Sequence, residues 1–153
     1  MRLTTKGRYA VTAILDIAQH GNDFPVAISA VSSRQGISQS YLEQLFSKLK
    51  KAMLVRSIRG PGGGYELALN PDAISVSDIL TAVGEGVDAT QCGGVGNCHE
   101  GKVCLTHELW TDLSIQIDLF LSSITVRALI NRTDVTTFTD GMSGVDLIEA
   151  RLV

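Results

Sequence analysis

The chain has 153 residues, of which 44% are hydrophobic, and a formal net charge of −3. This length allows one domain with its own core plus an appendage, and the hydrophobic fraction excludes a disordered chain. No apolar run reaches the ~18 residues that a membrane span needs, and the N-terminus lacks the apolar core of a signal peptide. We therefore expect a cytoplasmic protein with no membrane partner.

The net charge conceals a division into a basic and an acidic part. Residues 1–60 carry nine Lys and Arg against three acids, a balance of +6. Residues 61–153 carry four Lys and Arg against thirteen acids, a balance of −9, and the two parts sum to −3. Such asymmetry favours a basic half that faces a polyanion such as nucleic acid, with a solvated basic surface as the alternative.

The N-terminal part predicts a helix-turn-helix. Apolar residues at helical spacing indicate a first helix over residues 5–20. A short helix over about 29–35 ends at Gly36, and a longer helix over about 38–53 follows. Two helices joined by a short turn that contains glycine are typical of DNA-binding proteins, in which the second helix reads the major groove.

A β-hairpin follows these helices and completes a winged helix. Residues 54–59 and 65–69 read as two strands, and the glycine-rich run 60–64 between them cannot be helical. A fourth helix over about 76–83 closes the predicted DNA-binding domain, which we place at residues 1–84. The expected fold is mainly α with a small β-hairpin, extended by a long dimerisation helix.

The start of the longer helix supplies the residues that we expect to read DNA bases. Glutamines can pair with adenine, and Glu43 could accept a hydrogen bond from the cytosine amino group. A carboxylate beside DNA is unusual, so Glu43 could reject sites that lack cytosine, or it could merely cap its own helix with Ser40. Ser38 is the other possible cap. The expected base and phosphate contacts of this helix are Ser38, Gln39, Ser40, Tyr41, Glu43 and Gln44.

The hairpin tip offers a second set of DNA contacts. Arg59 is placed to enter a minor groove, although a simple surface arginine is the alternative. Gly60, Pro61 and Gly62 follow it, and glycine allows the backbone to approach a phosphate closely. No Gly-Lys-Ser or Gly-Lys-Thr follows the glycine run, which excludes a nucleotide-hydrolase loop.

The glycine-rich segment 85–104 contains all three cysteines, Cys92, Cys98 and Cys104, and His107 follows it. Three thiolates and one imidazole make a four-ligand site for a soft or borderline metal, and clustered cysteines in the cytoplasm favour ligands over disulfides. The spacing is not that of a zinc finger, so structural zinc is possible but not favoured. His99 is a rival ligand, but it directly follows Cys98 and adjacent side chains seldom converge on one ion.

A long helix over residues 105–130 is expected to form dimers. Its apolar positions recur every three and four residues, as in a coiled coil. Packing against its own domain is the alternative, but a seam of this length favours a second copy, and a two-fold dimer would read a pseudo-palindromic operator. The predicted seam residues are Trp110, Leu113, Ile117, Phe120 and Ile124. Residues 131–153 lose this pattern and are expected to form a mobile tail.

These motifs resemble the IscR family of bacterial iron–sulfur cluster regulators. The likeness rests on the segments MRLTTKGRYAVTAILDIA, QGISQSYLEQLFSKLKKAMLVRSIRGPGGGY and VDATQC…C…CLTH…LW, and it runs from residue 1 to about 130. It implies a homodimeric transcription factor that carries a 2Fe–2S cluster, received from the iron–sulfur assembly machinery. It assigns the cluster to Cys92, Cys98, Cys104 and His107. It also assigns DNA recognition to Ser40, Tyr41, Glu43 and Gln44, with Arg59 in the wing.

The resemblance implies a regulator of cluster-assembly genes, not an enzyme. Two other functions stay open at this point. The chain could be a nitric-oxide or redox sensor that uses the same ligands, or a carrier that hands its cluster to other proteins. The basic half and the wing argue against a carrier, because a carrier needs no contact with DNA.

Overall fold

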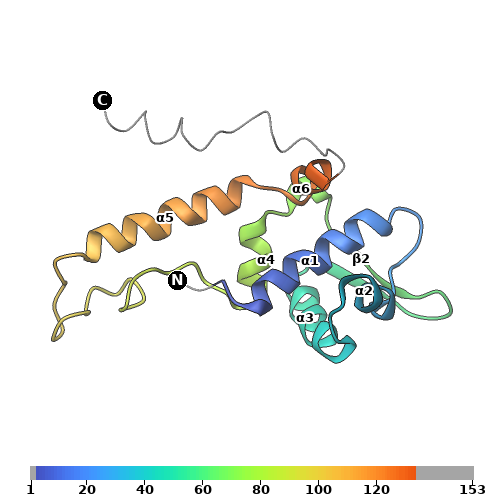
Figure 1. The fold of residues 1–153 in the computed structure, drawn as a ribbon, viewed down its shortest axis with the longest axis horizontal. Helices are drawn as coiled ribbons and strands as arrows, with labels where there is room; N and C mark the ends of the chain where they lie inside the picture. The colour runs from blue at the N-terminus through green and yellow to red at the C-terminus, as the bar shows by residue number, and fades with distance from the viewer. Residues whose placement is uncertain (1–2, 134–153) are drawn as a thin grey trace.

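A winged helix-turn-helix head and a long arm make up residues 3–133, which are the residues that the computed structural model describes (Figure 1). The mainly α fold with one small hairpin is confirmed. The tail expected over 131–153 lies outside the described residues, except that 131–133 belong to the last helix. Within residues 3–133, no helix combines the length and apolar character needed to cross a membrane.

Helix α1 (Thr5–His20) forms the centre of the head. Ala10, Ala13 and Ile14 on its inner face are fully buried. Small residues at such positions let other helices approach closely, and α2 (Ile28–Gln35) and α3 (Gln39–Lys51) both pack against α1. Helix α3 contributes the largest fully buried side chain, Phe46. The core of the head therefore holds α3 firmly against α1.

The wing is an antiparallel hairpin of β1 (Val55–Ile58) and β2 (Gly64–Leu67). Tyr65 of β2 also exchanges two backbone hydrogen bonds of 2.8 Å with Val26, which precedes α2. This isolated bridge ties the part of β2 next to the wing tip to the segment that precedes α2. The direction of the hairpin is consequently fixed relative to α3.

Helix α4 (Val76–Ala82) leads from the head toward the arm. Ser75 and Asp78 form a capping box at its start, in which the Ser75 hydroxyl accepts from the Asp78 N–H at 3.1 Å. A single 3-10 turn, η1 (Pro71–Ala73), connects β2 to this helix. Beyond α4 the chain runs out along the arm without regular structure until α5 begins.

The single helix expected over 105–130 is wrong, because the structure contains two helices there. Helix α5 (His107–Ser123) ends at Ile124, and α6 (Val126–Thr133) begins two residues later. Ile124 is extended, its carbonyl accepts from the Val76 N–H, and its side chain is only 9% exposed. Consecutive β-branched residues disfavour a helix and suit this short bridge. Ile124 is therefore buried in its own chain and does not belong to a dimer seam.

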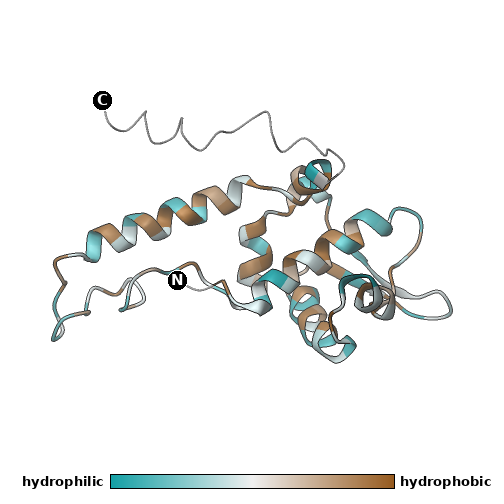
Figure 2. Ribbon diagram, in the orientation of Figure 1, coloured by the Kyte–Doolittle hydropathy of each residue, from teal (hydrophilic) through white to brown (hydrophobic). Residues whose placement is uncertain are grey.

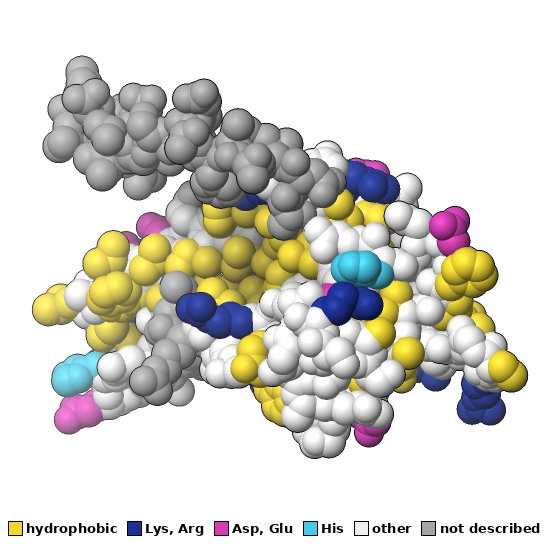
Figure 3. Space-filling model, turned by 45° about the vertical axis from the view of Figure 1, so that its right-hand side comes forward, with side chains coloured by type: hydrophobic (Ala, Val, Ile, Leu, Met, Phe, Trp, Pro, Cys, Tyr) yellow, Lys and Arg dark blue, Asp and Glu magenta, His cyan; other side chains and the backbone are white. Residues whose placement is uncertain are grey.

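Helix α5 lies along the arm with none of its residues buried. Hydrophobic positions recur along its whole length (Figure 2). A space-filling view shows hydrophobic side chains gathered on the arm side of the molecule (Figure 3). The exposed large hydrophobic residues of α5 are Leu109, Trp110, Leu113, Ile115, Leu119 and Phe120.

Candidate metal centre and nucleic-acid interface

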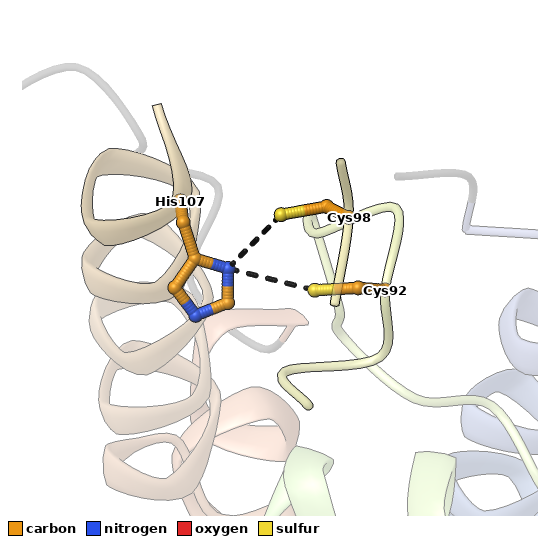
Figure 4. Close-up of side chains that lie close together, drawn as sticks. All are labelled: Cys92, Cys98 and His107. Carbon is orange, nitrogen blue, oxygen red and sulfur yellow. Dashed lines mark hydrogen bonds between the residues drawn. The ribbon is translucent and has the colours of Figure 1, made fainter. Parts of the chain in front are cut away.

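Two thiols and one imidazole converge where the loop after α4 meets the first turn of α5 (Figure 4). The Sγ atoms of Cys92 and Cys98 lie 3.5 and 3.7 Å from Nδ1 of His107. One ligand atom from each of these residues lies within 4.8 Å of the other two. Bonds of about 2.0–2.3 Å to one ion would bring such ligands only slightly closer. The donor atoms and their spacing fit a metal or a small cluster.

Cys104, the fourth expected ligand, lies beside this group. Its backbone N–H donates to Sγ of Cys98 at 3.2 Å, and its own Sγ lies 3.7 Å from Oγ1 of Thr106. A hydrogen bond between the two thiols raises the pKa of Cys98 and lowers the pKa of Cys104. The structure thus brings three of the four expected ligands together and holds the fourth next to Cys98.

Backbone N–H groups prepare Cys92 to act as a ligand. Hydrogen bonds from Gly96 and Gly94 outweigh burial and lower the pKa of the Cys92 thiol to about 6. Both glycines have positive φ angles, 79° and 78°, which a residue with a side chain rarely adopts. Because a thiolate is the form that binds metals, Cys92 is ready to bind at neutral pH.

Helix α5 orients the imidazole from its other side. Nε2 of His107 lies 3.5 Å from Oγ1 of Thr111, one helical turn further on. A partner at the second ring nitrogen fixes the orientation of a metal-binding histidine. The rival ligand His99 is exposed and pairs with Lys102 through its backbone, outside the converging group. The preference for His107 over His99 agrees with this arrangement.

An open cavity of about 580 Å³ lies in front of these ligands. Its wall includes the three cysteines, His107 and also His99, together with apolar and polar neighbours. Trp110 and Leu113 of α5 supply the apolar side, while Thr90 and Thr106 supply hydroxyl groups. The site is therefore reachable from solvent on one side and shielded by α5 on the other.

The expected recognition helix α3 begins at Gln39, and Ser38 caps it. The Ser38 hydroxyl accepts from the Tyr41 N–H at 3.4 Å. The capping role considered for Glu43 with Ser40 is therefore wrong, because the helix starts two residues earlier than such a cap requires. Glu43 instead accepts a hydrogen bond from Nε2 of Gln39 at 3.3 Å.

Most of the polar residues expected to read DNA face solvent on α3. Ser38, Gln39, Ser40, Glu43 and Gln44 are exposed. Tyr41 differs, because it is half-buried and its ring meets Tyr9 of α1 edge to face, with ring centroids 5.9 Å apart. The N-terminal end of α3, which carries the Ser38, Ser40 and Tyr41 hydroxyl groups, is thus supported by α1.

Arg59, Gly60, Pro61 and Gly62 form the exposed tip of the wing. Gly60 and Gly62 have φ angles of 105° and 73°, and a Cβ at either position would meet nothing within 4 Å. Glycine is required there for backbone conformation, and the surrounding space stays open to a partner.

The next two glycines serve the packing of the wing. A Cβ at Gly63 would lie 2.4 Å from the Ile58 carbonyl oxygen, and one at Gly64 would lie 2.4 Å from the Val26 carbonyl oxygen. Such distances are impossible, so a larger residue at position 63 would distort the hairpin, and one at position 64 would push β2 away from the Val26 backbone. Part of the glycine run is therefore explained by the fold of the head and needs no contact with DNA.

Comparison with known proteins identifies the family. Residues 3–132 match the family model of Rrf2, which is described as an iron-dependent transcriptional regulator. The chain belongs to the Rrf2 family. It is a transcriptional regulator with a DNA-binding winged helix and not an enzyme, as the sequence predicted.

Individual Rrf2 relatives cover nearly the whole chain. The HTH-type transcriptional regulator IscR of Yersinia pseudotuberculosis is 56% identical over 140 residues, which span 92% of this chain and 85% of that protein. The IscR of Yersinia enterocolitica is equally similar, with 56% identity over 140 residues. The family resemblance inferred from the sequence is confirmed.

Solved Rrf2 structures share the fold. IscR of T. potens superposes with a TM-score of 0.74 at 33% identity, covering 92% of this chain and 94% of that one. CymR, the global cysteine regulator of B. subtilis, gives a TM-score of 0.75 at 31% identity, covering 86% of this chain and 98% of that one. Both agree with a winged-helix head and a long arm.

Sequence reasoning missed residues that support the cysteine loop of this Rrf2 protein. Oγ1 of Thr90 accepts from the Gly94 N–H at 2.8 Å, and the Thr90 hydroxyl donates to Asp88 at 2.6 Å. Asp88 also accepts from the Thr90 backbone N–H, and these bonds lower the pKa of Asp88. An Asp two residues before a hydrogen-bonded N–H is a known turn signal, so the sequence contained the cue.

Proposed function

We propose that this chain senses the supply of iron–sulfur clusters through a bound 2Fe–2S cluster and controls the genes of cluster assembly. The convergence of Cys92, Cys98 and His107 in a winged-helix regulator carries the proposal. Repression of assembly genes in the cluster-bound state, and action on a second class of sites without it, follow from the resemblance to IscR proteins. The cytoplasm, where the assembly machinery would donate the cluster, is the expected location.

Cys104 would serve as the fourth ligand beside Cys92, Cys98 and His107. A 2Fe–2S cluster has two irons and takes four protein ligands, and histidine in place of cysteine shifts its reduction potential. All three cysteines are only partly buried, and the cavity in front of them is open. An accessible site with one weaker ligand suits a sensor, because a sensor must be able to lose what it detects.

The head would bind the major groove through α3 and a minor groove through the wing. The charge balance of +6 over residues 1–60 supports attraction to DNA. The exposed face of α3 offers amide and carboxylate groups for base edges, from Gln39 to Gln44. Arg59, Gly60, Pro61 and Gly62 at the wing tip would contact the backbone and the adjacent minor groove.

A second copy of the chain would cover the apolar face of α5. Trp110 and Leu113 are 40% exposed and Phe120 is 58% exposed, while Ile117 is half-buried between them. Their spacing of three and four residues places them on one side of the helix. Burial of this face between two copies would present two α3 helices to a pseudo-palindromic operator.

Absorbance and chemical analysis test the cluster. Protein purified without oxygen should be red-brown and contain iron and acid-labile sulfide in equal amounts. The Cys98→Ala variant should lose the colour while retaining its helical circular dichroism. A colourless wild-type protein that holds one tight zinc ion would contradict the proposal and indicate a zinc-stabilised DNA-binding protein.

Promoter binding tests the regulator role separately. Arg59→Ala should weaken binding to an operator by about tenfold, as expected for the loss of one specific arginine contact. Arg127→Ala is the matched control, because it removes the same charge from α6, where Arg127 pairs with Asp72. If the wild type and Arg59→Ala bound the operator equally well, the wing would not be part of the DNA interface.

A further inference from the structure

Glu85 joins the start of the cysteine loop to the start of α1. Its Oε1 accepts from the Thr4 hydroxyl at 2.7 Å and lies 3.2 Å from Nζ of Lys6. Its Oε2 accepts from the Thr4 backbone N–H at 3.2 Å. The hydrogen bond from the Thr4 hydroxyl is the main cause that lowers the pKa of Glu85. Both carboxylate oxygens of Glu85 thus bind Thr4, which lies 81 residues earlier in the chain.

This contact is tightly packed. The Glu85 side chain is only 10% exposed, although surface ion pairs are normally well solvated. A Cβ at Gly7 would lie 2.9 Å from Cδ2 of Leu80 and 3.3 Å from Cγ of Glu85. A larger residue at position 7 would therefore have to displace the Leu80 and Glu85 side chains. Packing and polar contacts therefore both hold this junction.

Glu85 also takes over the capping of α1. Thr4 is the N-cap residue of this helix, but its side chain makes no capping hydrogen bond. Its hydroxyl and its N–H both donate to the Glu85 carboxylate instead. A negative charge at a helix N-terminus is stabilising. Removal of Glu85 would therefore loosen the first turn of α1 as well as the loop.

The first turn of α1 leads directly to the recognition helix. Tyr9 lies one turn after Lys6 and meets the ring of Tyr41 edge to face, with ring centroids 5.9 Å apart. Tyr41 lies in the first turn of α3, and its N–H is bonded to the helix cap Ser38. Glu85, α1 and the DNA-reading end of α3 are therefore in contiguous contact.

We infer that Glu85 is a positioning residue that transmits the state of the cysteine loop to the recognition helix. The inference rests on the proposed function, because it assumes that the loop changes with cluster binding. When the loop is ordered around its ligands, Glu85 holds the start of α1 and, through Tyr9, the start of α3. A rearranged loop withdraws the carboxylate, and the DNA-reading end of α3 becomes more mobile.

The test compares operator affinities of cluster-loaded and cluster-free protein for the wild type and for Glu85→Ala. Physical contact does not by itself establish coupling, so the measured quantity is the ratio of the two affinities. Couplings between sites are typically about 5–150-fold. We expect Glu85→Ala to reduce the wild-type ratio at least about threefold. Glu85→Gln, which keeps the shape of the side chain, should reduce it less.

Glu66→Gln is the matched control. Glu66 pairs with Arg56 on the neighbouring strand of the wing, whereas Glu85 pairs with Thr4 and Lys6. This variant should leave the ratio unchanged, even if both affinities change together. A merely structural role of Glu85 would likewise change both affinities in parallel and leave the ratio intact, and that result would overturn the inference.

Amide hydrogen exchange provides a readout without DNA. In the cluster-loaded protein, Glu85→Ala should accelerate exchange in the first turn of α3 several-fold, as loss of the cluster should in the wild type, whereas Glu66→Gln should not. Unchanged exchange in α3 would overturn the inference. A wild-type protein whose DNA affinity is the same with and without its cluster would instead refute the proposed function, so the two failures are distinguishable.

Discussion

Two nitrogen atoms of Arg34, at the end of α2, donate hydrogen bonds to the carboxylate of Asp16 on α1. Nη2 lies 2.6 Å from Oδ1 and Nε lies 3.0 Å from Oδ2, and Gln35 adds a third bond of 2.7 Å to Oδ2. Asp16 is 1% exposed and is the only buried charged side chain among the described residues. This bidentate pair fixes the first helix of the helix-turn-helix onto the central helix of the head.

Asp16→Asn should destabilise the head by about 2 kcal/mol, because it leaves the Arg34 guanidinium without its charged partner. Burial raises the pKa of Asp16, but hydrogen bonds from Arg34 and Gln35 outweigh it and hold the pKa below its usual range. The stabilisation is therefore complete above the unfolded-state pKa of about 3.9 and disappears as the pH falls through the lower folded-state value. Urea unfolding at neutral and acidic pH measures this. A difference between the two proteins that stays constant down to about pH 2 would contradict it.

Glu43 and Gln39 should act as a pair in site selection. If Glu43 rejects sites without cytosine, Glu43→Ala broadens the sites that cluster-free protein binds. Since Gln39 donates to Glu43 at 3.3 Å, Gln39→Ala should change selectivity in the wild type but have little effect beside Glu43→Ala. Binding to a library of operator variants measures both effects. If the effects of the two substitutions on selectivity were additive, the hydrogen bond between Gln39 and Glu43 would have no role in site selection.

Cys92 should be the most reactive thiol of cluster-free protein near neutral pH. Its pKa of about 6 means that the thiolate fraction rises as the pH rises through about 6 and is nearly complete above 7. Cys98 is the internal control, because its pKa is raised. Alkylation at pH ~7, followed by peptide mass spectrometry, should modify Cys92 about tenfold faster than Cys98. Equal rates would show that the Gly94 and Gly96 N–H groups do not stabilise the thiolate.

Phe120→Glu should convert dimers to monomers without unfolding the head. The side chain is 58% exposed in one chain, so the substitution removes little internal packing. It would place a charge in the interface proposed for α5. Ser122→Glu is the control, because two residues further along a helix it faces about 160° away from the apolar side at 100° per residue. Analytical ultracentrifugation should separate the two, and a dimeric Phe120→Glu protein would refute this interface.

Met53→Gly should stabilise the protein by about 1 kcal/mol, because Met53 follows α3 with a φ angle of 63° and is 72% exposed. Gly36, the residue directly after α2, has the same left-handed conformation, with a φ angle of 65° and open space around it. Gly36→Ala should therefore destabilise by a similar amount, about 1 kcal/mol. Thermal unfolding measures both, and shifts of the same sign would contradict the account.

The sequence was sufficient for features that depend on local patterns. Apolar spacing predicted α1 and α3, and the glycine run predicted the wing between β1 and β2. The family resemblance rested on such segments and was confirmed by the Rrf2 match. In the candidate site, thiol and imidazole chemistry predicted Cys92, Cys98, Cys104 and a histidine, because few other residues bind soft metals. Position in the chain, not chemistry, favoured His107 over His99, and the structure brings Cys92, Cys98 and His107 together.

Features that depend on distant contacts could not be predicted. The residues around Ile124 in the sequence give no sign that its carbonyl accepts from the Val76 N–H. The apolar spacing of α5 therefore seemed to continue through Ile124 as one helix. Glu85 looked like a loop acid, because its partners Thr4 and Lys6 are about 80 residues away. The role of Gly64 depends on the Val26 backbone in the same way.

The arm leaves the head and returns to it at the two ends of a single short helix. Glu85 is the third residue after α4, and the Ile124 carbonyl accepts from the N–H of Val76, the first residue of α4. A helix of 7 residues is about 10 Å long, a gap that about four extended residues can bridge. Residues 86–123 therefore form an insertion that leaves the head and re-enters it at the two ends of α4, and α5 packs back against this helix. Under the proposed function, the segments assigned to sensing and dimerisation form one continuous insertion, and we expect a head without it to bind DNA as a monomer that no longer responds to iron.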